Sequence, residues 1–254
     1  MELKISHSAG YFSNMTIRLY ELLDFMRKNG YYPKLDSSEQ FGVYKEGNED
    51  LSKIYIKEID DEIPFNIPNL DKDFMSFQFD DYRTLDFEGL KPIIYKYFSI
   101  GDLIQENKDK IKKKYGLDKY ISVFYRGNDK NTEITNPSYD LFIQKAKELE
   151  HLGLPYLVLP DECKFINEFK KHISNVITLD ETPCIDFPDG NLMVHMPLNE
   201  RPEYGAIYNA VVSLLSEGQY LITHSGNGGV WCCLYRGSAD SVIQIYKDKV
   251  YSHE

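Results

Sequence analysis

The sequence lacks several features that assign proteins to a class at once. It contains no apolar run near the ~18 residues that a transmembrane helix needs, and its first residues show no apolar core of a signal peptide. Basic residues are in the minority, 29 Lys and Arg against 40 Asp and Glu, so the net charge of −11 argues against a broad nucleic-acid-binding surface. We therefore expect a cytoplasmic protein with no transmembrane segment and no nucleic-acid partner.

Cysteine is scarce, and the common nucleotide-binding and metal-binding motifs are missing. The four cysteines show neither a CxxC pair nor the Cys and His spacing of a zinc site, so we expect reduced, packed thiols. No Walker loop is present, and the first strand–helix turn has no GxGxxG, which argues against a single-Rossmann dinucleotide enzyme. Asp71-Lys72-Asp73 is formally a DxD metal motif. Because no apolar strand precedes it, we interpret it as a solvated loop and expect no metal.

What the chain does contain is a regular alternation of strand and helix patterns in its second half. Short apolar runs predict four strands, and amphipathic stretches predict a helix after each of them. Such alternation is typical of a doubly wound, Rossmann-like α/β domain. The predicted strands are residues 121–125, 155–159, 176–179 and 220–223, and the predicted helices are residues 138–151, 163–172, 203–217 and 230–235.

The first half opens with a strand–helix–strand pattern, which predicts the start of another parallel sheet. The two strands are residues 3–6 and 31–36, whereas residues 41–88 are aromatic and acidic without clean periodicity and are predicted to be irregular with short strands. A lysine-rich helix at residues 99–115 ends at Gly116, where we place a domain boundary. The two predicted domains are residues 1–116 and 117–254.

A charged loop directly follows the predicted strand at residues 121–125. It contains two cations, Arg126 and Lys130, and two carboxylates, Asp129 and Glu133. In open α/β sheets, ligands bind just beyond the carboxyl ends of strands. This composition suits an anionic ligand together with acid–base chemistry, although a surface turn with solvated charges has the same composition.

A glycine-rich turn follows the last predicted strand and leads into a helix. Its glycines allow a ligand to approach the backbone, and the start of a helix presents N–H groups to an anion. Tight packing of the helix on the strand is the alternative explanation. The candidate ligand-binding residues here are His224, Ser225, Gly226, Asn227 and Gly228.

The loop sequence RGNDKNTE, followed by Pro137 and an amphipathic helix, resembles the Arg-(Arg)-x-Asp-Lys…Glu loop of the α1,6-fucosyltransferase and nodulation fucosyltransferase group. The resemblance implies a GT-B-like α/β fold of two Rossmann-like domains with a ligand cleft between them. It implies that Arg126 binds the β-phosphate of a nucleotide sugar, that Lys130 lies near the reacting centre and that Glu133 is the catalytic base. Gly127 replaces the second arginine of the family's pair, and the gap between lysine and glutamate is one residue shorter.

The resemblance extends to the late turn and, more faintly, to the N-terminus. Ser225 matches a serine that contacts phosphate, and the loop containing Gly10 and Tyr11 is similar to a Gly-Phe-Phe-Ser turn. We therefore expect Gly10 and Tyr11 to contact substrate and His7 to lie across the cleft from Glu133. Helix capping and core packing are the alternatives for this loop. Asp129 is expected to orient the loop, either by pairing with Arg126 or by capping the turn, and not to act as the base.

The function that the resemblance implies is an inverting, metal-independent glycosyltransferase. It would move fucose from GDP-fucose to a hydroxyl of a glycan acceptor, with the nucleotide sugar bound by the C-terminal domain and the acceptor by the N-terminal one. No cofactor is expected besides this donor substrate. A different donor such as UDP-xylose, or a non-catalytic nucleotide- or glycan-binding module, is the alternative.

Overall fold

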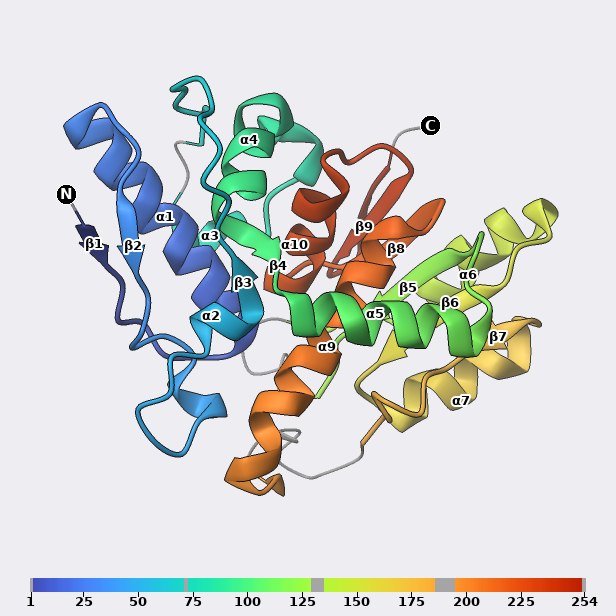
Figure 1. Ribbon diagram of the computed structural model, residues 1–254. Coiled ribbons are helices and arrows are strands. Elements are labelled where there is room, and N and C mark those ends of the chain that lie inside the picture. Colours follow the sequence, from blue (N-terminus) through green and yellow to red (C-terminus); the bar gives the residue numbers. More distant parts are fainter. Residues whose placement is uncertain (1, 71–72, 129–134, 186–194, 253–254) are drawn as a thin grey trace.

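The computed structural model describes residues 2–70, 73–128, 135–185 and 195–252 (Figure 1). Its largest element is a six-stranded sheet with the order β10-β9-β8-β5-β6-β7. The antiparallel pair is β10 with β9, and the other neighbours pair in parallel. The strands are β5 (Ile121–Tyr125), β6 (Tyr156–Pro160), β7 (Val176–Ile177), β8 (Tyr220–His224), β9 (Val242–Tyr246) and β10 (Lys249–Tyr251).

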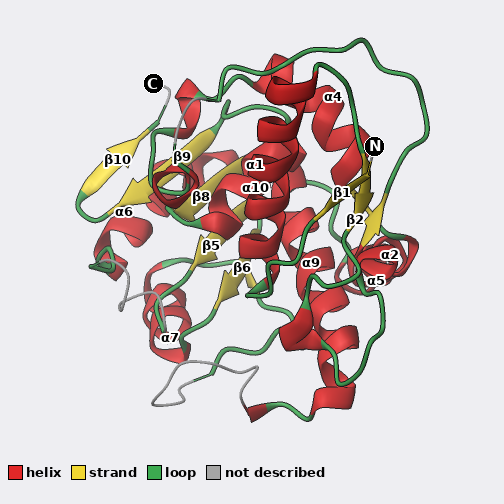
Figure 2. Ribbon diagram, turned by 90° about the vertical axis from the view of Figure 1, so that its left-hand side faces the viewer, coloured by secondary structure: helices red, strands yellow, loops and turns green. Residues whose placement is uncertain are grey.

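Helices cover both faces of this sheet, as a parallel sheet requires. Alternate residues of β5 point to opposite faces: Ile121 and Val123 pack with α6 and α7, and Phe124 packs in the cluster that contains α9 and α10. Figure 2 shows these two helix pairs on opposite sides of the strands. The helices are α6 (Tyr139–Leu149), continued by η4 (Glu150–Leu152), α7 (Cys163–His172), α9 (Arg201–Glu217), preceded by η5 (Leu198–Glu200), and α10 (Asn227–Arg236).

The N-terminal part begins with β1 (Glu2–Lys4), α1 (Tyr11–Asn29) and β2 (Lys34–Asp36). The two strands pair in parallel, which confirms the predicted strand–helix–strand opening. Helix α1 ends at Gly30, whose φ of 75° is the left-handed conformation that glycine adopts readily. The elements that follow are η1 (Gly42–Tyr44), α2 (Ser52–Tyr55), β3 (Ile56–Lys57), α3 (Phe74–Phe77), η2 (Tyr82–Thr84), α4 (Phe87–Phe98), β4 (Ser99–Ile100) and α5 (Asp102–Tyr115).

One hydrophobic cluster joins the two halves of the chain. It contains buried residues of α1 and α4 together with those of α9 and α10. Within this cluster the ring of Trp231 lies 5.0 Å from that of Phe98, and its indole N–H donates to Thr16 at 3.0 Å. The predicted α/β class is therefore confirmed, whereas the division into domains at residue 116 stays a prediction. None of the helices described is long and apolar enough to cross a membrane.

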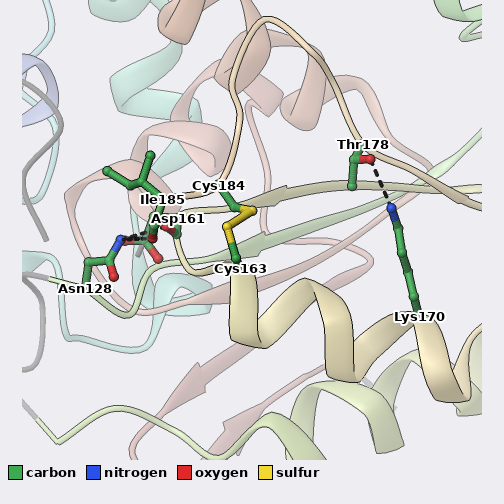
Figure 3. The surroundings of a disulfide bond; sticks show 7 residues. All are labelled: Asn128, Asp161, Cys163, Lys170, Thr178, Cys184 and Ile185. Carbon is green, nitrogen blue, oxygen red and sulfur yellow. Dashed lines mark hydrogen bonds between the residues drawn. A yellow bond between two sulfur atoms is a disulfide. The ribbon is translucent and has the colours of Figure 1, made fainter. Parts of the chain in front are cut away.

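The prediction of four reduced cysteines is wrong for two of them. Cys163 and Cys184 form a disulfide (Figure 3), while Cys232 and Cys233 are buried thiols in α10 as expected. The chain leaves β7 and returns across the start of α7, which brings the two Cα atoms within 5.0 Å although 21 residues separate them. Sequence spacing alone does not reveal such a return. Disulfides are rare in the cytoplasm, so the expected compartment stays a prediction.

Candidate functional site

The order of the strands defines where a ligand site is expected. From β5 the chain proceeds outward through β6 to β7, and then crosses to the other side of β5 to form β8 and β9. The carboxyl ends of β5 and β8 therefore flank the point where the sheet order reverses, which is where open α/β sheets bind ligands. Arg126 follows β5, and His224 ends β8. The structure thus brings together the two loops that the sequence predicted to face each other.

The side chain of Arg126 is held by Asp161, the residue that follows the neighbouring strand β6. Its Nε donates to Asp161 Oδ2 at 3.0 Å, and its Nη1 donates to the Tyr208 hydroxyl at 3.4 Å. Asp161 Oδ1 accepts the N–H of Gly127 at 2.7 Å, so one carboxylate fixes both the guanidinium and the loop backbone. The side chain of Arg126 keeps 35% of its surface exposed. It is therefore oriented by the protein and still accessible to a ligand.

The main chain of Arg126 is held from the other side by His224. The imidazole Nδ1 lies 2.7 Å from the carbonyl oxygen of Arg126. Because a carbonyl oxygen only accepts, Nδ1 carries the proton in this contact. The His224 ring is buried and lies over that of Tyr125, with 6.3 Å between centroids and 27° between the ring planes. His224 thus lies beside Arg126 and supports its loop; its contact with a substrate stays a prediction.

Tyr208 brings helix α9 into the site. Burial raises the pKa of its hydroxyl, and the nearby Arg126 guanidinium only partly opposes this effect, so the side chain is a neutral phenol at physiological pH. Its ring lies 6.3 Å from that of Phe12 at the start of α1. Tyr208 therefore connects the Arg126 loop with the N-terminal part of the chain. Neither Tyr208 nor Asp161 was among the predicted site residues.

The glycine-rich turn after β8 is engaged by the protein itself. Ser225 is fully buried, and its hydroxyl accepts from the Gln244 amide at 2.8 Å. The Gly226 N–H donates to the Tyr82 hydroxyl at 3.0 Å, and the Asn227 N–H donates to Gln78 Oε1 at 3.1 Å. A phosphate could bind these groups only if it replaced the Tyr82, Gln78 and Gln244 contacts. Contacts of this turn with a phosphate therefore stay a prediction.

Close packing explains two glycines of the same turn. A Cβ atom at Gly228 would lie 2.5 Å from the Phe124 ring on β5, and one at Gly229 would lie 2.5 Å from the carbonyl oxygen of His224. The side chain of Asn227 is also engaged, since its oxygen accepts from the Thr16 hydroxyl at 2.8 Å. Tight packing, the alternative explanation for this turn, therefore accounts for Gly228 and Gly229. The hydrogen bond of Asn227 also links α10 to α1.

The predicted N-terminal residues lie at the beginning of α1. His7 Nε2 is 3.3 Å from the Ser13 hydroxyl, and Gly10 is the residue that precedes the helix. Tyr11 is buried, with its ring 5.2 Å from that of Phe41 and 5.4 Å from that of Tyr55. Tyr11 therefore serves the core, and substrate contacts by these residues stay predictions.

The remaining predicted residues lie outside the residues that the structure describes. These are Asp129, Lys130 and Glu133, together with Asp71 and Lys72 of the DxD triplet. Within the described ranges, no group of three His, Cys, Asp or Glu side chains is arranged to hold a metal ion.

Comparison with known proteins places this geometry in a known architecture. No protein-family model and no curated protein sequence matches the chain. Three solved structures of NodZ match it along nearly its whole length. NodZ α-1,6-fucosyltransferase soaked with GDP-fucose has a TM-score of 0.55 at 11% identity, covering 96% of this chain and 94% of that one. The enzyme co-crystallised with GDP has a TM-score of 0.52 at 10% identity, covering 98% and 96%.

The third structure, selenomethionine fucosyltransferase NodZ from Bradyrhizobium, has a TM-score of 0.51 at 9% identity and covers 98% of this chain and 96% of that chain. At such low identity a structural match carries the fold, whereas activity has to be argued from the site. The predicted resemblance to this group is thereby confirmed at the level of architecture: the chain has the GT-B-like fold of the NodZ fucosyltransferases.

Proposed function

We propose that this protein is a glycosyltransferase that takes its sugar from a nucleoside diphosphate donor. The observation that carries the proposal is the position of Arg126 at the switch point of a GT-B-like sheet. Its guanidinium is oriented by Asp161 and its main chain by His224. An arginine that is fixed at the carboxyl end of a central strand and is still partly exposed suits the recognition of phosphate oxygens.

The chemistry of sugar transfer explains why a fixed cation is needed there. When the bond between the sugar and the diphosphate breaks, negative charge develops on the departing nucleoside diphosphate. A guanidinium that is already oriented stabilises this charge without reorganising during the reaction. Asp161 neutralises part of the arginine's charge, but it also prevents the side chain from rotating away from the site. Lys130, four residues later in the sequence, is proposed to supply a second cation.

The acceptor hydroxyl must lose its proton as it attacks the sugar. We propose Glu133 as the general base, because a carboxylate close to the cationic loop suits proton removal in an inverting displacement. Arg126 and Lys130 then perform the electrostatic work that a divalent metal does in other glycosyltransferases. The reaction is accordingly proposed to be inverting and metal-independent, with a glycan hydroxyl as the acceptor.

GDP-fucose is the proposed donor. The support comes from the loop resemblance and from the GT-B-like architecture shared with a fucosyltransferase studied with GDP-fucose and GDP. The sequence departs from that group at Gly127, which removes one cation next to Arg126. This departure favours keeping a second donor class, such as UDP-xylose, as the alternative. A binding module without catalysis is the other alternative, and it needs only the arginine.

A ligand screen followed by a transfer assay separates these possibilities. The thermal shift of the protein is measured with GDP and with UDP, because a ligand at about 100 times its dissociation constant stabilises by roughly 2.7 kcal/mol. Transfer from radiolabelled GDP-fucose to a mixture of oligosaccharides is then measured with and without EDTA. Stabilisation by GDP with EDTA-resistant transfer is the expected result. Stabilisation by UDP alone changes the donor, binding without transfer favours the module, and no binding to either nucleotide overturns the proposal.

A further inference from the structure

The Cys163–Cys184 disulfide lies next to the residues that hold Arg126. Cys163 begins α7 two residues after Asp161, and Cys184 immediately precedes Ile185. The Ile185 N–H donates to the carbonyl oxygen of Asp161 at 3.1 Å. The covalent bond therefore joins the two chain segments that meet at the backbone of Asp161 (Figure 3).

Hydrogen bonds continue from this junction to the arginine loop. The side-chain amide of Asn128 donates to the carbonyl oxygens of Asp161 at 2.6 Å and of Ile185 at 3.2 Å, as Figure 3 shows. The Asp161 carboxylate accepts from Gly127 N–H and from Arg126 Nε. A displacement of the Asp161 backbone therefore moves both the guanidinium and the loop that follows it.

Two features of the disulfide bear on how it responds to a reductant. Both half-cystines are partly exposed, so a small thiol reductant can reach them. Residues 178–185, which include Cys184, form no helix or strand, and their described links to the Arg126 loop and to Asp161 are those made by Ile185. Once the bond is broken, the free energy that keeps Ile185 against Asp161 falls, because the chain between the cysteines regains its freedom.

We propose that the Cys163–Cys184 disulfide is a positioning element of the candidate site, which makes nucleotide binding dependent on the oxidation state of this pair. The inference rests on the proposed role of Arg126 in binding a nucleoside diphosphate. In the switching step a dithiol supplies two electrons and two protons, the S–S bond breaks to two thiols, and the dithiol closes to its own disulfide. If reduction leaves about a tenth of the molecules with Arg126 in position, the apparent affinity falls about tenfold.

Calorimetry with GDP on the full chain tests this inference. The oxidised protein is compared with protein treated with dithiothreitol, and with a Cys163→Ser/Cys184→Ser variant under both conditions. We expect reduction to weaken GDP binding of the wild type about tenfold. The double variant should bind at the weaker level throughout and be insensitive to the reductant, which controls for Cys232 and Cys233. In an Asp161→Asn background reduction should have less effect, because the route from the disulfide to Arg126 is already weakened.

Hydrogen exchange at the Gly127 amide supplies a readout that does not depend on the nucleotide. This N–H is bound by Asp161, so its exchange should accelerate on reduction. Faster exchange in a protein that binds no nucleotide would refute the proposed function and leave the positioning role intact. Unchanged GDP affinity and unchanged Gly127 exchange after reduction, even with a lower Tm, would show a purely structural disulfide and overturn the inference. The inference would also be overturned if oxidised glutathione failed to re-form the Cys163–Cys184 disulfide in the reduced protein.

Discussion

His224 Nδ1 lies 2.7 Å from the carbonyl oxygen of Arg126, so strand β8 holds the main chain of a residue whose side chain is held from β6. Arg126 follows β5, the strand between these two. One residue is thus fixed from both neighbours of its own strand. Folding already orders the long arginine side chain, so a ligand loses little of its binding free energy in ordering it. This favours tight binding of an anion.

Replacing His224 tests this support. His224→Ala removes the donor of a partly buried hydrogen bond to the Arg126 carbonyl oxygen, and we expect the free energy of unfolding to fall by about 1–3 kcal/mol. GDP affinity should fall as well, because the loop loses an anchor. His224→Asn is the matched control, since its amide N–H can take the place of Nδ1–H. Urea denaturation and calorimetry measure the two effects. Equal losses in both variants would show that the ring, and not the hydrogen bond, is what matters.

Gly127 offers a second test, since the space beside it is filled. A Cβ atom there would lie 2.1 Å from Glu162 Oε1, and the Glu162 carboxylate is itself held by the Tyr139 hydroxyl. Gly127→Ala should therefore cost about 1–3 kcal/mol of stability through overpacking. In a double-mutant cycle with Glu162→Ala, the removal of the carboxylate should make the alanine at 127 better tolerated, by about 1 kcal/mol or more. Additive losses in chemical denaturation would contradict this explanation.

The contact between position 127 and Glu162 also explains why this chain has a glycine at position 127. The fucosyltransferase group is expected to carry a second arginine where this chain has Gly127. In the structure the carboxylate of Glu162, the residue after Asp161, occupies the space that the Cβ atom of such a side chain would need. The two positions are 35 residues apart in the chain, so the link between them depends on the pairing of β5 with β6.

Local patterns predicted the elements of the site better than its contacts. The predicted bounds of strand β5 match the observed ones, because a run rich in apolar β-formers ends abruptly at Arg126. The partner of Arg126 was assigned to Asp129, three residues away, whereas the structure adds Asp161. Pairing across strands depends on the strand order, which periodicity does not encode. Likewise the turn N–H groups at Gly226 and Asn227 are bound from a segment without periodicity.

The contact between α5 and α9 has a predictable dependence on pH. Lys108 and Lys112 both pair with Glu217 at the end of α9. Burial acts to raise the pKa of the Glu217 carboxyl, but the two lysines outweigh it and keep the pKa below its usual value. A carboxyl whose pKa is lowered by folding stabilises the protein above its unfolded-state pKa, and this contribution is lost as the pH falls through the folded-state value.

Glu217→Gln should therefore lower the free energy of unfolding at pH 7 by about 1 kcal/mol or less, since Glu217 is one-third exposed. The difference from the wild type should shrink as the pH falls below about 4. Glu203→Gln, at an exposed position of the same helix, is the control and should have little effect at either pH. Denaturant titrations at both pH values measure the difference. If the difference in free energy of unfolding between the wild type and Glu217→Gln stayed constant with pH, the ion pairs of Glu217 would contribute no net charge interaction.

The arginine loop allows binding to be separated from chemistry. Arg126→Ala should weaken GDP binding by roughly 1.5–3 kcal/mol, the range for a hydrogen bond to a charged group, and should reduce transfer as well. Arg126→Lys keeps the charge but loses the fork that contacts Asp161 and phosphate together, so it should recover only part of the affinity. Arg83→Ala is the control, because the described hydrogen-bonding partners of Arg83 are Asp81 and the Ser252 carbonyl oxygen and not the residues that hold Arg126. Calorimetry with GDP compares the three variants.

Glu133→Gln should behave in the opposite way. A base for the acceptor hydroxyl contributes little to holding the diphosphate, so donor affinity should stay close to that of the wild type. Transfer should fall about a hundredfold or more, the usual scale for losing a general base. Single-turnover transfer from GDP-fucose and calorimetry with GDP are run on the same preparation. If Glu133→Gln transfers at the wild-type rate, the base is another residue. If Arg126→Ala binds GDP normally, the phosphate-binding role of the loop is refuted, and with it the observation that carries the proposed function.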